Sequence, residues 1–117
     1  MLHPWLNDYS IDCNSKKLIL GTHPPMPYNG DLKFFYGNMN EFWRLISKVY
    51  TDDEFYEFGQ SQDLQKILKF LKKYDYSITD MVYETKDGTF NVDSKMTVLK
   101  LNPFLYEWLK KSSINEI

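Results

Sequence analysis

The sequence predicts an α/β fold in which parallel strands alternate with helices. Two stretches with strand character, residues 17–22 and 77–85, are separated by two segments with helical periodicity, and a third helical segment follows them. Strands that alternate with helices are typical of layered folds with a parallel sheet. The length of 117 residues and the apolar fraction of 43% indicate a single globular domain over residues 1–117.

The first strand, residues 17–22, contains the apolar run Leu18-Ile19-Leu20, whose composition suits a strand buried on both faces. Pro24, Pro25 and Pro27 follow it and exclude a helix or a central strand from the next segment. A stiff loop therefore leaves the carboxyl end of a buried strand. In open α/β sheets this end is where ligands bind.

Two amphipathic helices are expected after this loop, over residues 41–50 and about 62–74, with an acidic and aromatic connection at 51–59 between them. Ser61 is a suitable cap for the second helix. The lysines of the second helix are interpreted as a solvated face, with a phosphate-contacting surface as the alternative. The apolar positions expected to face the core are Phe42, Leu45, Ile46 and Val49 in the first helix and Leu64, Ile67, Leu68 and Leu71 in the second.

The last third of the chain contains the second predicted strand, residues 77–85, followed by a turn at 86–89. Residues 96–101 are expected to be extended. Asn102-Pro103 combines a capping residue with proline at the first helical position, and this pattern indicates a third helix that ends near Lys111.

Both ends of the chain carry further signals. At the start, His3-Pro4-Trp5 interrupts an irregular lead-in and is expected to bury the indole ring. Residues 114–117 have the character of the approach to another strand. A sheet of two or three strands exposes an edge, so we expect completion either by another copy of the chain, as a homo-oligomer, or by further sequence.

Composition and charge exclude several classes of function. The net charge of −2 and the pI near 5.6 give no overall basic field for nucleic acid. No apolar run is long enough to cross a bilayer, and the first residues lack the pattern of a secretory signal, so a cytoplasmic location without a membrane partner is expected. Cys13 is the single cysteine, and the sequence has no phosphate-binding loop, nucleophile elbow or paired-histidine motif. No metal or cofactor is expected.

The stretch from residue 17 to residue 50 resembles the uracil-DNA glycosylase superfamily, in the branch of the mismatch-specific and hypoxanthine-DNA glycosylases. The matching segments are LILGTHPP, then FFYGN, then NEFW at the start of a helix, and ITDMVYET resembles the strand after the second helix. The resemblance covers residues 3–117, roughly the amino-terminal half to two-thirds of a family domain. It implies a three-layer αβα sandwich around a short parallel sheet, which would be incomplete in this chain.

The same resemblance implies an enzyme of DNA base-excision repair. Members of the family flip a damaged base such as uracil or hypoxanthine out of the duplex and hydrolyse its N-glycosidic bond. DNA with a damaged or mismatched base is therefore the expected partner. The candidate catalytic residues are Asn40 and His23, and the candidate substrate-binding residues are Gly21, Thr22, Pro24, Pro25, Phe35, Tyr36 and Asp80.

These candidates have different expected roles. Asn40 matches the asparagine that is implicated in catalysis in the hypoxanthine branch and reads the base edge elsewhere. His23 lies where relatives vary, and its position makes it a candidate general base near neutral pH. Phe35 or Tyr36 would stack on the base, and residues 21–25 would line the base pocket and position water. Asp80 matches an aspartate at the end of the second strand, without an assigned role.

Each candidate also has a structural interpretation. Asn40 is a suitable helix N-cap, Phe35 and Tyr36 are suitable core aromatics, and His23 and Asp80 fit ordinary loop, cap or turn positions. Trp43 is interpreted as a core residue, and Gly21 has a turn as its alternative. Residues 21–25 also lack the acidic residue that the most active branches of the family use to orient water, and the sequence has no counterpart of the family's second signature, a loop that stabilises the leaving base. We therefore expect slow catalysis. The alternative functions are a non-catalytic base- or DNA-binding module and an assembly module.

Overall fold

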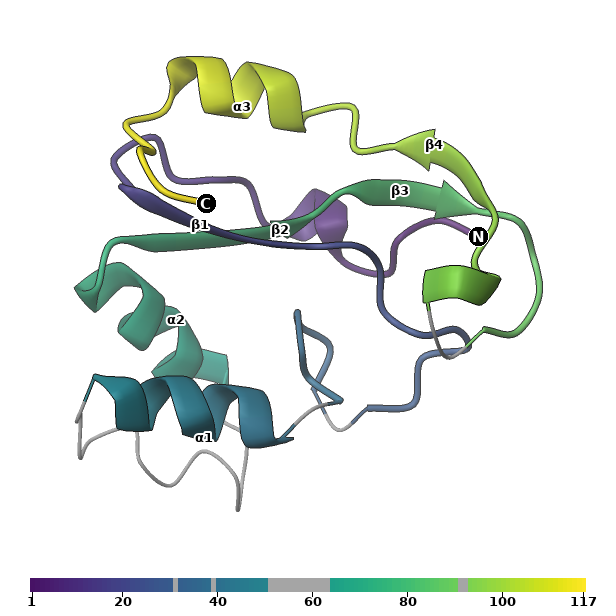
Figure 1. Cartoon of the computed structure of the whole chain (residues 1–117), viewed down its shortest axis with the longest axis horizontal. Helices are drawn as coiled ribbons and strands as arrows, with labels where there is room; N and C mark the ends of the chain where they lie inside the picture. Colours follow the sequence, from purple (N-terminus) through teal and green to yellow (C-terminus); the bar gives the residue numbers. More distant parts are fainter. Residues whose placement is uncertain (31, 39, 51–63, 91–92) are drawn as a thin grey trace. The chain divides into compact units, whose positions relative to one another are not determined.

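The structure of the chain is a computed structural model that describes residues 1–30, 32–38, 40–50, 64–90 and 93–117 (Figure 1). These residues form short strands and helices, so the mixed α/β class is confirmed. They fall into two compact units. Met1–Tyr28 and Asp75–Ile117 form the first, here called the sheet unit, and Asn29–Tyr74 form the second, here called the helical unit.

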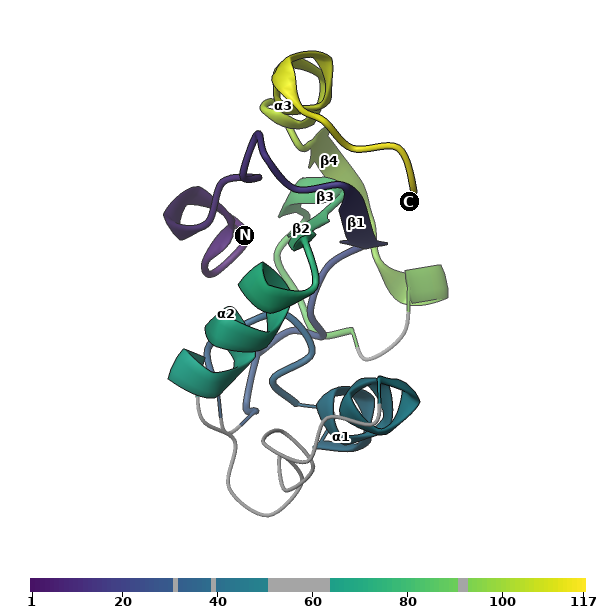
Figure 2. The same ribbon diagram turned by 90° about the vertical axis from the view of Figure 1, so that its left-hand side faces the viewer.

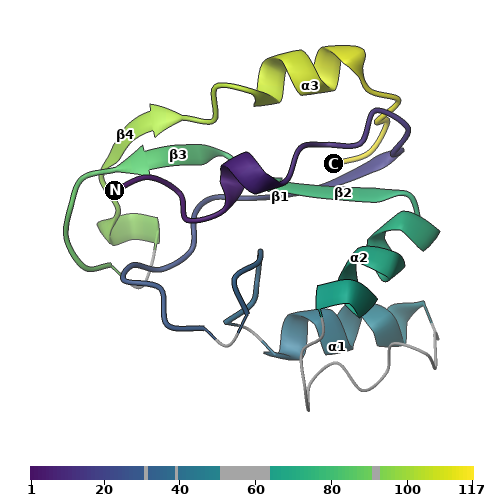
Figure 3. The ribbon, with the colours of Figure 1, turned by 180° about the vertical axis from the view of Figure 1, so that it is seen from behind.

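The sheet unit contains two parallel strands, β1 (Lys17–Gly21) and β2 (Tyr76–Asp80), which lie side by side in Figures 1 and 3. Their register places Gly21 opposite Asp80 at the carboxyl end of the pair. The first predicted strand is thus confirmed. Because parallel strands end at the same edge, the loop that leaves Gly21 and the carboxylate of Asp80 emerge from the same end of the pair.

The prediction of one continuous strand over residues 77–85 is wrong. The segment is divided at Met81 into β2 and β3 (Val82–Thr85), and β3 pairs antiparallel with β4 (Val98–Leu101) in a second two-stranded sheet. The predicted extended segment at 96–101 is therefore present as β4. The expectation of parallel strands throughout holds for one pair and fails for the other.

Backbone bonds at Met81 explain this division. Its amide donates to the carbonyl of Gly21 at 2.8 Å, and its carbonyl accepts from the amide of Asn102 at 2.7 Å. Met81 is thereby bonded to the last residue of β1 through its amide and to Asn102, the residue after β4, through its carbonyl. The side chain of Met81 is exposed between the buried Asp80 and Val82, so the division is set by these backbone bonds and not by the burial pattern.

The amino-terminal segment adds to the second sheet. Leu2 forms an antiparallel bridge with Glu84 of β3, and the amide of His3 donates to the carbonyl of Tyr83 at 2.7 Å. Figure 3 shows this segment beside β3. A 3-10 turn, η1 (Leu6–Asp8), follows it. Trp5 is 3% exposed, so the predicted burial of its indole ring is confirmed.

The third predicted helix is present as α3 (Leu105–Lys111). Its start depends on Asn102, whose Oδ1 accepts hydrogen bonds from the amides of Phe104 at 2.9 Å and Leu105 at 3.1 Å. Oxygen acceptors of this kind satisfy the free amides of a first turn. Asn102 thus satisfies amides at the start of the helix, as expected, but the N-cap residue is Phe104 and the helix begins at Leu105, so the prediction of Pro103 as the first helical residue is wrong.

The carboxyl-terminal residues reach β1 on the side away from β2. Glu116 forms a parallel bridge with Lys17, and the amide of Leu18 donates to the carbonyl of Glu116 at 2.8 Å. The strand-like character predicted for residues 114–117 is therefore found in one bridge. β1 thus has partners on both of its edges at this end.

The helical unit contains α1 (Asn40–Val49) and α2 (Leu64–Lys73), which are shown from two sides in Figures 1 and 2. Both agree with helices predicted from apolar spacing. In α2 the buried residues are Ile67, Phe70 and Leu71. The predicted connection at 51–59 and the cap at Ser61 lie outside the described residues.

The buried face of α1 differs from the predicted one. Leu45 and Val49 are 62% and 72% exposed, whereas Trp43 and Ser47 are fully buried. Trp43 and Ser47 are one helical turn apart and therefore share a face. The large indole ring determines which face packs inward, so the apolar stripe is shifted by two residues from the prediction for Leu45 and Val49. The interpretation of Trp43 as a core residue is confirmed.

Over the described ranges, the longest apolar helical stretch is too short to cross a lipid bilayer.

Candidate functional site

The carboxyl end of the β1–β2 pair brings together several of the predicted site residues. Thr22, His23 and Pro24 follow β1, and Asp80 ends β2. His23, Pro24 and Asp80 are buried, whereas Thr22 and Pro25 are partly accessible. The hydroxyl of Thr22 donates to Oδ2 of Asp93 at 2.8 Å, so this loop is held to the turn before β4.

His3, which the sequence did not single out as a site residue, lies against Asp80. Nε2 of His3 is 2.7 Å from Oδ2 of Asp80, and both side chains are buried. On the other side of the ring, Nδ1 of His3 is 3.2 Å and 3.1 Å from the amide nitrogens of Trp5 and Leu6. An amide N–H can only donate, so Nδ1 carries the lone pair and Nε2 carries the proton.

This proton arrangement defines the pair. Nε2–H of His3 donates to Oδ2 of Asp80, which accepts. Neither nitrogen of His3 is left for a ligand, so His3 itself cannot take a proton from one. Asp80 makes no other side-chain hydrogen bond in the described part of the chain. Its second oxygen, Oδ1, is therefore open to a further donor.

His23 has the opposite arrangement. Its Nδ1 lies 2.8 Å from the carbonyl oxygen of Pro24, and a carbonyl only accepts, so Nδ1 carries the proton. Nε2 consequently carries the lone pair, and among the described residues it has no hydrogen-bond partner although it is buried. Burial lowers the pKa of His23 below its usual value of 6.5, against the smaller opposing effects of the Pro24 hydrogen bond and the charge of Asp80.

Aromatic rings surround these two histidines. The ring centroids of His3 and His23 are 5.0 Å apart, and Phe90 lies 5.6 Å from His23 on another side. Trp5 packs edge-on against His3 at 5.2 Å. Burial of His23 among these rings is the desolvation that lowers its pKa. We call His3, His23 and Asp80 the His–Asp–His cluster.

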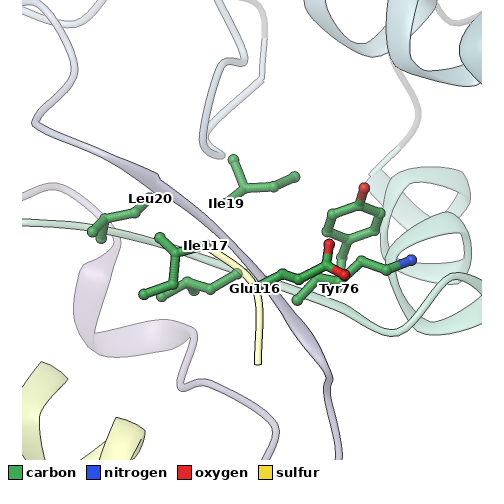
Figure 4. Close-up of a pocket in the computed structure, with 7 residues that line it drawn as sticks. Ile19, Leu20, Tyr76, Glu116 and Ile117 are labelled. Atoms are coloured by element: carbon green, nitrogen blue, oxygen red, sulfur yellow. The ribbon is translucent and has the colours of Figure 1, made fainter. Parts of the chain in front are cut away.

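A separate pocket with a volume of about 530 Å³ lies along β1. Figure 4 shows its lining side chains, which come from β1, from the start of β2 and from the carboxyl-terminal residues Glu116 and Ile117. Lys17 lies over the ring of Tyr76 at 5.0 Å from the centroid. None of the three residues of the His–Asp–His cluster lines this pocket.

The remaining candidates, Phe35, Tyr36 and Asn40, belong to the helical unit. Phe35 is 1% exposed, packs against Phe34 and accepts a hydrogen bond from Nε1 of Trp43 at its carbonyl, at 3.2 Å. These contacts favour the core interpretation of Phe35. Asn40 is the first residue of α1.

Tyr36 stands apart from Phe35. Its φ of 58° lies in the left-handed region, which costs a residue with a side chain about 1 kcal/mol. Its ring is half-buried and stacks on Phe42 of α1 with centroids 4.0 Å apart and an interplanar angle of 19°. Uncommon backbone conformations of this kind occur at sites where a side chain must be held in one direction.

The chemistry available at the cluster is acid–base chemistry. His23 offers an unprotonated nitrogen, and Asp80 offers a carboxylate oxygen. Within the described residues, no group of three or more histidine, cysteine or acidic side chains is arranged to hold a metal ion.

These features define a mixed α/β chain with buried titratable groups at the end of a parallel strand pair. Comparison with protein-family models, with curated proteins and with solved structures found no match to the chain. Function is therefore inferred from the residues and their geometry.

Proposed function

We propose that the chain is a DNA glycosylase-like enzyme that holds a flipped, damaged base such as uracil or hypoxanthine and hydrolyses its N-glycosidic bond. The observation that carries the proposal is the unprotonated, unpartnered Nε2 of His23 at the carboxyl end of the β1–β2 pair. A neutral imidazole with a free lone pair is the form of histidine that can accept a proton from water.

In the proposed reaction, a water oxygen forms a bond to C1′ of the sugar while the bond from C1′ to the base nitrogen breaks. The base leaves with the electron pair of that bond. Nε2 of His23 accepts a proton from the water, and the departing base is later protonated by solvent. The products are the free base and an abasic sugar. The lowered pKa of His23 ensures that its acceptor form predominates at neutral pH.

One further feature, in the sequence, supports this proposal. The segments that resemble the glycosylase superfamily include the strand and loop that carry His23 and the strand that ends at Asp80. The three-layer αβα sandwich of that family is part of the same proposal. The same resemblance assigns base stacking to Phe35 or Tyr36 and base-edge recognition to Asn40, all of which belong to the helical unit.

The direct test measures release of free base from oligonucleotides that contain uracil or hypoxanthine. We expect slow release by the purified chain, because electrostatic stabilisation of a leaving group is often the largest catalytic term and the sequence has no loop for it. His23→Gln should reduce the rate at least about a hundredfold. Cys13→Ser, at an exposed position, serves as the matched control and should leave the rate unchanged.

Two outcomes contradict the proposal. One is no release of either base by the folded chain under conditions where a known glycosylase acts on the same oligonucleotides. The other is release that His23→Gln leaves unchanged.

A second candidate function is an assembly module. β4 has no buried residue, and Val98, Leu99 and Leu101 are 45%, 58% and 61% exposed. An exposed apolar edge strand is a template for pairing with another chain. Sedimentation at increasing protein concentration tests this candidate, since association that Leu99→Lys abolishes would support it and a monomer at all concentrations would exclude self-association.

A further inference from the structure

We infer that His3 is a positioning residue, which holds the carboxylate of Asp80 in place beside His23 and so sets the environment in which His23 accepts a proton. This inference rests on the proposed function insofar as His23 is the proton acceptor. It adds a residue from the amino-terminal segment, far from both strands in the sequence, to the site.

The first step of the argument concerns the two nitrogens of His3. Nδ1 accepts from the amides of Trp5 and Leu6, so the ring is fixed relative to η1. Nε2–H then has one direction available, and Asp80 Oδ2 occupies it at 2.7 Å. The backbone at Trp5 and Leu6 therefore fixes the position of the His3 ring, and the ring in turn fixes the position of the Asp80 carboxylate. A histidine between backbone and carboxylate fixes the carboxylate's orientation more firmly than a flexible side chain.

The second step concerns how Asp80 is accommodated in a buried place. Burying a carboxyl group is costly unless a hydrogen-bond donor faces it. Nε2–H of His3 supplies such a donor to Oδ2 of Asp80, and Oδ1 makes no side-chain hydrogen bond within the described part of the chain. Removing this donor therefore removes the contact that fixes the orientation of Asp80.

The third step connects Asp80 to His23. The two histidine rings are 5.0 Å apart, and the charge of Asp80 raises the pKa of His23 against the effect of burial. The other charged or titratable groups that act on His23 are His3 itself and the amino group of Met1. Asp80 is the one anion among them, so it is the group that supports a proton on Nε2 of His23.

Two substitutions at the same position separate this role from a purely structural one. His3→Asn retains an oxygen at the place of Nδ1, which can accept from the amides of Trp5 and Leu6, but its side chain is too short to reach Asp80. His3→Gln retains an N–H donor at the place of Nε2 and loses the acceptor for the two amides. The first variant keeps the turn, and the second keeps the contact with Asp80.

The rate of base release is measured at a temperature at which both variants are folded. We expect His3→Asn to lower the rate about tenfold to a hundredfold, as misplacement of a supporting group does, and His3→Gln to stay within about threefold of the unsubstituted chain. Equal losses in both variants, or a larger loss in His3→Gln, would show that His3 only supports the turn and would overturn the inference.

A second readout does not depend on activity. Ring 15N chemical shifts report the protonation of each imidazole nitrogen during a pH titration. We expect the titration of His23 to be unchanged in His3→Gln and altered in His3→Asn. Asp80→Asn preserves an oxygen that accepts from His3 while removing the charge, so His23 should titrate at a lower pH in this variant. A titration of His23 that is the same in all of these proteins would overturn the inference.

The two readouts separate the two proposals. If the unsubstituted chain releases no base, the proposed function fails, and the titration of His23 still decides the role of His3. If base is released and His23→Gln abolishes it, but His3→Asn changes neither the rate nor the titration, the proposed function stands and the role of His3 fails.

Discussion

The two units of the chain bury very different side chains. The sheet unit buries polar groups in specific hydrogen bonds, among them His3 with Asp80, Ser77 with Ser15, and Asn102 with the carbonyl of Asp80. The helical unit buries mainly aromatic rings: Phe34, Phe35, Trp43 and Phe70 are at most 1% exposed. Aromatic cores contribute stability through buried area, whereas satisfied polar networks make the core rigid and specify one arrangement of its groups. The sheet unit is therefore where we expect side chains to be held in the fixed geometry that a reaction needs.

The largest expected effect tests the aromatic side of this comparison. Trp43→Ala removes a fully buried indole ring and its hydrogen bond to the carbonyl of Phe35. We expect the free energy of unfolding to fall by about 4 kcal/mol. Urea denaturation followed by tryptophan fluorescence and by far-UV circular dichroism measures the loss. A loss below about 1 kcal/mol would contradict the packing described for α1.

The next effect tests the polar side. His3→Ala leaves the carboxylate of Asp80 without its donor and leaves the amides of Trp5 and Leu6 without their acceptor. Removal of one partner of a buried pair typically costs about 3 kcal/mol. Asp80→Asn, in which the contact with His3 can persist, should cost less. Equal losses in the two variants would show that the charge of Asp80, rather than the contact, determines stability.

A smaller effect concerns pH. The pKa of His23 is lowered in the folded chain, mainly by burial, relative to about 6.5 in the unfolded chain. Above pH 6.5 the imidazole is neutral in both states and contributes no pH dependence. As the pH falls below 6.5, the unfolded chain binds the proton first, so the free energy of unfolding decreases until the pKa of the folded state is reached.

Denaturation curves at several pH values between 7 and 5 measure this contribution. His23→Gln should remove it, and the difference in slope between the two proteins isolates His23 from the carboxylates, which titrate in both. If the free energy of unfolding depends on pH equally in the unsubstituted chain and in His23→Gln, His23 is no more buried in the folded chain than in the unfolded one.

The smallest expected effect concerns the side of α1 that the apolar spacing marked as the core face. Leu45 is 62% exposed, and substitutions at exposed positions usually change stability by about 0.5 kcal/mol or less. Leu45→Ala is thus the control for Trp43→Ala on the same helix. If Leu45→Ala lowers the free energy of unfolding by more than about 2 kcal/mol, the face of α1 predicted from the sequence, and not the observed one, packs in the core.

The sequence alone was sufficient where local patterns determine structure. The apolar run at Leu18, the helical spacing in α2 and the capping signal at Asn102 each depend on residues within a few positions, and each element is present. The division at Met81 could not be predicted, because it depends on bonds to Gly21 and Asn102 from other parts of the chain. The buried face of α1 was mispredicted because spacing does not weigh the size of an indole ring.

The candidate site shows the same limit. His23 was named from its position in the loop after the first strand, and Asp80 from the resemblance to the glycosylase superfamily. Parallel pairing of β1 and β2 brings the two to the same end of the strand pair. His3 was interpreted only as part of the segment that buries Trp5. Its contact with Asp80 spans 77 positions of sequence, and no local pattern signals a contact of that range. The available signal was the segment His3-Pro4-Trp5, which predicted that the amino terminus is held in place by burial of the indole ring.

In the proposed reaction, the hydrogen bond from Nδ1 of His23 to the carbonyl of Pro24 has a consequence for repeated turnover. A histidine that gains a second proton keeps both N–H groups as donors, so uptake at Nε2 leaves the bond to Pro24 intact. The ring can thus cycle between its two charge states without rotating. His23 would return to its neutral form by losing the proton on Nε2 to solvent, and the surrounding chain would not need to rearrange between one reaction and the next.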